Sequence, residues 1–100
     1  MKTTTRDEIL RNLAANRETL RSLGVRSLAL FGSCARGEDT AVSDLDFVVE
    51  FEHKSFDAYM DLKAFLEDLF GRPVDLVLPN TIKPRLRSAI MQELVHAPGF

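Results

Sequence analysis

The chain has 100 residues, the size of one small domain, so we expect no catalytic domain accompanied by a separate substrate-binding domain. Its 45% of hydrophobic and 28% of charged residues are ordinary for a folded domain and do not suggest a disordered chain. A net charge of −2 argues against a protein that binds nucleic acid directly.

The first predicted element is a helix over about residues 6 to 22. Thr5, followed three residues later by Glu8, fits a capping box, and leucine and isoleucine then recur near helical spacing. Gly24 is the predicted stop, because glycine adopts the left-handed conformation without a Cβ clash. The next run, VRSLALF, is short and apolar and predicts a mostly buried strand that ends at Phe31.

Strand and helix then alternate along the rest of the chain. In DLDFVVEF the apolar residues recur at every second position, which predicts a second strand. A helix from Ser55 onward is ended by GRP at residues 71–73, and VDLVL predicts a third strand. A last helix is predicted to begin near Pro84 and to bury Leu86, Ile90 and Leu94. We therefore predict one α/β domain over residues 1–100, a small mixed sheet of about three strands flanked by helices.

Residues that could form a disulfide or a structural zinc site are scarce. Cys34 is the only cysteine, and the two histidines, His53 and His96, are far apart in the sequence. No segment resembles a signal peptide or an apolar membrane span. We therefore expect a protein of the reducing cytoplasm that does not contact a membrane.

Asp44 and Asp46 stand at the start of the second predicted strand. Residues two apart in a strand share a face, with Cα atoms about 6.5 Å apart, so both carboxylates point to the same side. Neighbouring carboxylates repel each other, and a bound divalent cation such as Mg²⁺ removes that repulsion. Asp75 interrupts the third apolar strand, where an ionised side chain is costly without a partner. Three converging acids would satisfy two Mg²⁺ ions about 3.5 to 4 Å apart, the arrangement used for phosphoryl chemistry.

Gly32 and Ser33 follow the first predicted strand directly. A glycine permits close approach to the backbone, and the N–H groups and hydroxyl of such a turn form an anion site for phosphates. Arg36 is the nearest cation and either adds a phosphate contact or pairs with Glu38 or Asp39. The turn and the acids would then form two walls of one site.

The spacing of these motifs resembles that of a known family. GS at residues 32–33, ten further residues and DLD at 44–46 resemble the G-S-x10-D-x-D signature of nucleotidyltransferases similar to DNA polymerase beta. The chain length, the PVDLV strand and the KPRLRSAIMQELV helix resemble the smallest members, the minimal nucleotidyltransferases. The resemblance covers about residues 23 to 95.

The resemblance implies an enzyme that transfers AMP from ATP onto a hydroxyl and releases pyrophosphate. It also implies an antitoxin that binds a HEPN-domain ribonuclease toxin and adenylylates one of its tyrosines. Carried over to this chain, Gly32 and Ser33 would hold the β- and γ-phosphates. Asp44 and Asp46 would ligate both Mg²⁺ ions, and Asp75 would ligate the ion that activates the acceptor and could receive the acceptor proton.

Several alternatives stay open from the residues alone. SDLD could be only a turn that leads into a strand, and Asp75 could pair with Arg72 or Arg85. An antitoxin could act by binding alone, and transfer to a small molecule such as an aminoglycoside would call for an additional helical domain. The basic residues that flank the last helix form either a solvated face or a contact with acidic surface of a partner: Lys83, Arg85 and Arg87.

Overall fold

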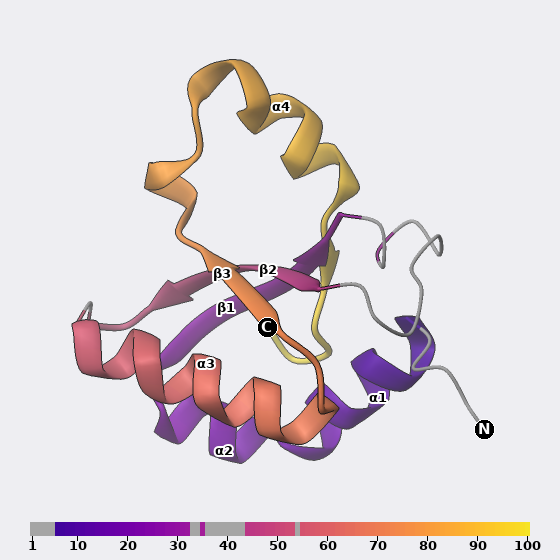
Figure 1. Ribbon diagram of the computed structural model, residues 1–100, viewed down its shortest axis with the longest axis vertical. Coiled ribbons are helices and arrows are strands. Elements are labelled where there is room, and N and C mark those ends of the chain that lie inside the picture. Colours follow the sequence, from indigo (N-terminus) through magenta and orange to yellow (C-terminus); the bar gives the residue numbers. More distant parts are fainter. Residues whose placement is uncertain (1–5, 33–34, 36–43, 54) are drawn as a thin grey trace.

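A computed structural model describes residues 6–32, 35, 44–53 and 55–100. In chain order its elements are α1 (Arg6–Ala15), α2 (Arg17–Ser22), β1 (Val25–Phe31), β2 (Leu45–Phe51), α3 (Phe56–Phe70), β3 (Val74–Val77), the 3-10 helix η1 (Pro79–Thr81), α4 (Pro84–Glu93) and β4 (Val95–His96). The first three α-helices cover one face of the sheet, and α4 stands on the other side (Figure 1). The predicted α/β fold with a small mixed sheet flanked by helices is confirmed.

The sheet has the strand order β3-β2-β1-β4. β1 pairs antiparallel with β2 and with β4, whereas β2 and β3 are parallel. In the parallel pair, Asp46 lies opposite Asp75. In the antiparallel pair, Phe31 lies opposite Asp46, and a bulge at Arg26 shifts the register near the other end of β1. The end of β1 and the starts of β2 and β3 therefore meet at one edge of the molecule.

The hydrophobic core lies between the sheet and α1, α2 and α3. The alternation in β2 is confirmed, because its four predicted core positions are buried there: Leu45, Phe47, Val49 and Phe51. The helices contribute fully buried isoleucine and leucine side chains: Ile9, Leu13, Leu20, Leu62 and Leu66. Since successive strand residues point to opposite faces, Asp46, Val48 and Glu50 lie on the face of β2 away from this core, here called the site face.

The boundaries of α3 agree with the sequence prediction. The Ser55 hydroxyl accepts a hydrogen bond from the Ala58 N–H at 3.0 Å and so caps the first turn. At the other end Gly71 adopts a left-handed conformation with φ of 64°, and its N–H donates to the Glu67 carbonyl at 2.8 Å. Both ends of the helix are thus fixed by residues of the types that the sequence offered.

The single helix predicted over residues 6 to 22 is wrong, because the chain forms α1 and α2 with a break at Asn16. The Asn16 side-chain amide donates to the Asn12 carbonyl at 2.8 Å, and its backbone φ of −109° departs from helical geometry. An asparagine side chain that bonds to nearby backbone competes with helix formation in this way. Thr5 of the predicted capping box lies outside the described residues.

The last helix begins at Pro84 as predicted, but it does not bury the three predicted side chains. Leu86 is 48% exposed, and Ile90 and Leu94 are only partly buried. None of the described helices is both long and apolar enough to cross a membrane.

The last helix stays outside the core because of a fourth strand, β4, which was not predicted. β4 pairs with β1, with Ala29 opposite His96, whereas β3 lies at the other edge of the sheet. The connection between them must therefore cross β2 and β1. Three strand spacings amount to about 14 Å, and a ten-residue helix is about 15 Å long. α4 spans the sheet as a crossover on the side of the site face, instead of packing into the core (Figure 1).

Candidate active site

Two of the three predicted acids are direct neighbours on adjacent strands. Asp46 is the second residue of β2 and Asp75 the second residue of β3, and they are paired across the parallel strands, which lie about 4.8 Å apart. Asp44 immediately precedes β2 and is exposed, as is Asp75, whereas Asp46 is half-buried. The sheet register therefore brings together carboxylates from positions about thirty residues apart in the sequence.

The negative charges of Asp44 and Asp75 both act on the Asp46 carboxyl group. Burial raises the pKa of its carboxyl above the ordinary range, and the negative charges of Asp75 and Asp44 raise it further. Among the described residues, no three histidine, cysteine or acidic side chains are gathered closely enough to form a ready-made metal cage. Two of the aspartates are exposed and repel the third, and their oxygen atoms are of the kind that hard divalent cations prefer. By the chemistry of the donors, the site fits such a cation.

Gly32 closes the site on the side of β1. Its φ is +81°, a conformation that favours glycine, and a Cβ at this position would lie only 2.5 Å from Oδ2 of Asp46. The Gly32 backbone therefore lies directly against the Asp46 carboxylate. Ser33 and Arg36, the other predicted residues of this turn, lie outside the described residues.

Side chains of α3 hold the outer edge of β3, a feature that was not predicted from the sequence. The Tyr59 hydroxyl donates to the Leu76 carbonyl at 3.0 Å. The Lys63 ammonium donates to the Val74 carbonyl at 2.7 Å, and the Val74 N–H donates to the Glu67 carboxylate at 2.9 Å. The spacing of four residues between these helix positions places them in one row. We call this row, Tyr59, Lys63 and Glu67, the α3 ladder.

The α3 ladder fixes the residues on both sides of Asp75. Val74 and Leu76 are bound at the backbone, so the Asp75 side chain is held at a defined position beside β2. The polar pair at positions 63 and 67 beside the buried Leu62 and Leu66 was the available signal in the sequence. That spacing predicts an ion pair on a helix surface, but not the strand to which it binds.

The ion pair in the ladder makes a pH-dependent contribution to stability. The hydrogen bond from Lys63, 2.8 Å long, holds the pKa of Glu67 below its ordinary range, and the Val74 N–H acts in the same direction. A carboxyl group whose pKa is lowered by folding stabilises the fold at any pH above its unfolded-state pKa. This stabilisation is lost as the pH falls through the folded-state pKa. The same bond raises the pKa of Lys63, whose contribution is lost only at strongly alkaline pH.

Replacing Glu67 with glutamine should therefore lower the melting temperature at pH 7, and the difference from wild type should shrink as the pH falls below the ordinary pKa of a glutamic acid. Asp68→Asn, at an exposed position of the same helix, is the matched control and should show no such convergence. Thermal unfolding followed by circular dichroism across this range measures both. A difference that stayed constant with pH would contradict the ionic contribution.

The comparisons with known proteins agree with one another. A profile of the nucleotidyltransferase domain matches residues 12–96. Protein adenylyltransferase MntA of Thermococcus cleftensis is 37% identical over 94 residues, which cover 92% of this chain and 95% of that protein. A protein of Methanocaldococcus jannaschii, provisionally named a protein adenylyltransferase, is 42% identical over 76 residues, covering 72% of this chain and 76% of its own length.

Solved structures share the fold over most of the chain. One, provisionally named a minimal nucleotidyltransferase, superposes with a TM-score of 0.70 at 38% identity and covers 86% of this chain and 93% of its own. A toxin–antitoxin structure with AMP-PNP superposes with a TM-score of 0.64 at 22% identity and covers 95% of this chain and 73% of its own. The second likeness concerns the arrangement of helices and strands.

Proposed function

This chain belongs to the nucleotidyltransferase domain family, and we propose that it transfers AMP from ATP to a hydroxyl group of a protein. The observation that carries the proposal is the pairing of Asp46 with Asp75, with the Gly32 backbone directly against Asp46. The two paired acids and Gly32, the first residue of the proposed phosphate turn, thus adjoin at one edge of the sheet. The Thermococcus cleftensis relative matches nearly the whole chain, and its name, protein adenylyltransferase, supports AMP as the transferred group and a protein as the acceptor.

The proposed ligands are carboxylates throughout, from Asp44, Asp46 and Asp75, a set that suits Mg²⁺. When bound, two Mg²⁺ ions would neutralise charge on the transferred phosphoryl group and on the leaving pyrophosphate and would favour ionisation of the acceptor hydroxyl. The raised pKa of Asp46 supports this assignment, because it marks a place where added positive charge is favourable.

The remaining chemistry falls to residues around the acids. Gly32 lets the Asp46 carboxylate lie against the start of the turn, and we assign Ser33 and Arg36 to hydrogen bonds with the β- and γ-phosphates. The acceptor oxygen forms a bond to the α-phosphorus as the bond from that phosphorus to the β-phosphate oxygen breaks. The acceptor proton passes to Asp75, directly or through water, and pyrophosphate leaves.

The partner that we propose is a HEPN-domain ribonuclease toxin, with one of its tyrosines as acceptor. This part rests on the resemblance to minimal nucleotidyltransferases. The protein would then be an antitoxin that acts in the cytoplasm, where ATP and such a toxin are both available.

Incubation with α-labelled ATP, Mg²⁺ and a HEPN-domain protein encoded beside this chain should label that protein with AMP. Chelation of Mg²⁺ by EDTA should stop the transfer. Asp44→Asn should slow it by more than about a hundredfold, since even changes behind metal ligands reach that size. Transfer that survives substitution of both Asp44 and Asp46 would refute the mechanism.

Neutralisation by binding alone is the second candidate, favoured by the exposed apolar side chains of α4, Leu86 and Met91. The double variant Asp44→Asn/Asp46→Asn separates the two candidates, since it removes two of the three acids and leaves α4 unchanged. If it neutralises the toxin as well as wild type does at equal concentration, catalysis is not what neutralises it.

A further inference from the structure

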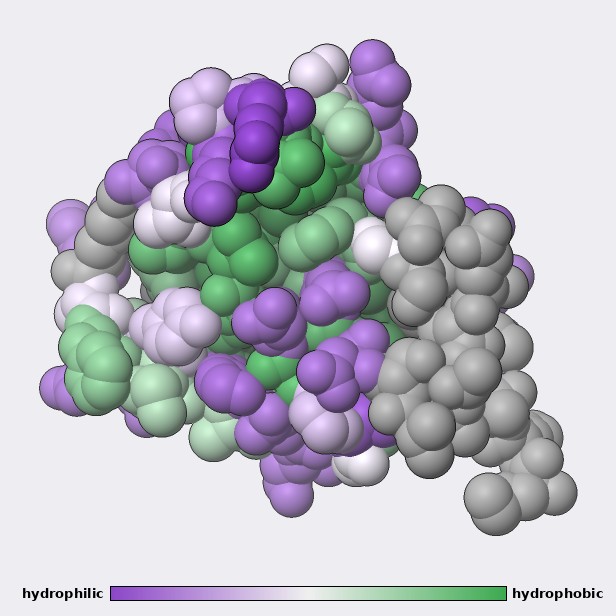
Figure 2. Space-filling view, turned by 45° about the horizontal axis from the view of Figure 1, so that its top comes forward, coloured by the Kyte–Doolittle hydropathy of each residue, from purple (hydrophilic) through white to green (hydrophobic). Residues whose placement is uncertain are grey.

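α4 packs only loosely against the rest of the described fold. It is described along its whole length, and none of its residues is buried. Leu86 and Met91 are 48% and 41% exposed. Figure 2 shows hydrophobic surface gathered at the middle of this side of the molecule and framed by hydrophilic side chains. A ten-residue helix is marginal in water unless it buries an apolar face, so α4 offers a surface that a second protein could stabilise.

α4 follows β3, the strand whose Asp75 is proposed to receive the acceptor proton. β3 carries Asp75, and η1 alone separates β3 from α4 in the chain. Gly32 lies on the other side of Asp46, next to β1. A protein that delivers its hydroxyl to Asp75 therefore approaches from the side on which the chain leads into α4.

Three basic residues give this region a positive charge: Lys83, Arg85 and Arg87, here called the basic edge. All three are exposed, in a chain whose net charge is −2. The Arg87 guanidinium also donates to the Pro79 carbonyl at 2.5 Å and thereby ties α4 to η1. The basic edge stands out from the overall charge of the molecule and is complementary to an acidic surface.

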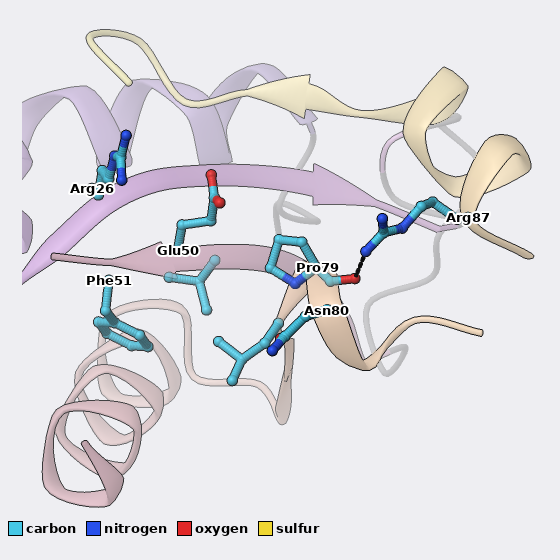
Figure 3. Close-up of a pocket in the computed structure, with 8 residues that line it drawn as sticks. Arg26, Glu50, Phe51, Pro79, Asn80 and Arg87 are labelled. Carbon is cyan, nitrogen blue, oxygen red and sulfur yellow. Dashed lines mark hydrogen bonds between the residues drawn. The ribbon is translucent and has the colours of Figure 1, made fainter. Parts of the chain in front are cut away.

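A cavity of about 430 Å³ adjoins the basic edge. Arg87 lines it together with Asn80, and Arg26 reaches it from the bulge in β1 (Figure 3). Glu50 also lines it, on the same face of β2 as Asp46. Four residues of strand separate these two acids by about 13 Å. An extended segment of about four residues would therefore reach from the cavity to the site of transfer.

We propose that the basic edge and this cavity dock the acceptor protein through an acidic segment next to its reactive hydroxyl. The inference rests on the proposed function, which supplies the need for a protein acceptor. ATP is a weaker candidate for the cavity, because the length of β1, about 20 Å, separates Arg26 from the phosphate turn. Among the described residues, Glu50 is the one acidic side chain that lines the cavity, and it should oppose docking.

A fluorescent Glu/Tyr copolymer is a suitable probe, since it presents tyrosine among acidic residues, and binding is read by anisotropy without ATP. Arg85→Glu should weaken binding roughly threefold to tenfold, as expected for reversal of a rim charge. Arg11→Glu, which makes the same charge change on exposed α1, should leave binding unchanged. Glu50→Gln should bind at least as tightly as wild type, and a Lys/Tyr copolymer should bind more weakly.

Equal binding by wild type and Arg85→Glu would overturn the docking proposal. So would an equal loss in Arg11→Glu, weaker binding by Glu50→Gln, tighter binding of the Lys/Tyr copolymer, or tighter binding of a single-stranded RNA, which would identify a nucleic-acid surface.

AMP transfer to the same copolymer separates this inference from the proposed function. If docking holds, Arg85→Glu raises KM for the copolymer and leaves kcat and the KM for ATP unchanged. Charge-dependent binding without any AMP transfer would contradict the proposed function and leave docking intact. Transfer at the same KM in wild type and Arg85→Glu would contradict docking and leave the proposed function intact.

Discussion

Asp46→Asn should abolish AMP transfer and at the same time raise the melting temperature of the metal-free protein. The carboxylate is half-buried and faces two other acids, which together raise its pKa. A carboxyl whose pKa is raised on folding binds its proton more tightly in the native state. The ionised form therefore destabilises the fold, and stability falls as the pH rises from about 4 through the folded-state pKa. Asparagine keeps the shape and removes the charge.

Thermal unfolding at pH 7 in the presence of EDTA measures the change in melting temperature, and assays with labelled ATP measure AMP transfer. We expect transfer to fall by more than about a hundredfold. Wild type should gain stability when Mg²⁺ is added, because a ligand that binds only the native state stabilises it, whereas Asp46→Asn should gain little. Asp61→Asn, at an exposed position of α3, is the control for loss of one charge. A lower melting temperature for Asp46→Asn than for wild type would show that the ionised Asp46 carboxylate does not destabilise the fold.

Gly32→Ala should impair both the fold and the reaction. The added Cβ would lie 2.5 Å from Oδ2 of Asp46, and the φ of +81° is unfavourable for alanine. Either the turn or the carboxylate must move. We expect a loss of about 1–3 kcal/mol in the free energy of unfolding. Transfer should fall about a hundredfold, as for a displacement of about 1 Å at a reacting centre.

Gly24→Ala is the matched control, because Gly24 also has a positive φ, +91°, but a Cβ there would meet no atom within 4 Å. It should lose stability through backbone strain and retain AMP transfer. Urea unfolding and the transfer assay on both variants separate strain from crowding. If the two variants lost transfer equally, contact with Asp46 would not be the cause.

Local patterns were sufficient to predict the positions of two acids of the candidate site. The period-two alternation in β2 placed Asp46 on the face away from the core, and the interruption of VDLVL marked Asp75. The structure then showed the pairing of these residues across parallel strands. Ser33 and Arg36 lie outside the described residues, so their place in the turn stays a prediction.

The features that were missed depend on contacts between distant segments. β4 has two residues, too few for any period, and exists only because it pairs with β1. The apolar spacing in α4 is the same for a helix that packs on a core and for one whose apolar side chains stay exposed. The burial of Leu86 was therefore predicted wrongly. The break at Asn16 arises from a bond to Asn12 that competes with ordinary helix geometry.

The α3 ladder also determines how this sheet can meet other chains. An unprotected edge strand is a template on which a further strand can add, and this leads to aggregation or to strand exchange. On β3 the N–H and the carbonyl of Val74 and the carbonyl of Leu76 are already bonded to Glu67, Lys63 and Tyr59. The opposite edge, β4, is only two residues long. Strand addition is thus hindered at β3 by the α3 ladder and offered only a short template at β4, which favours partners that bind helical and loop surfaces.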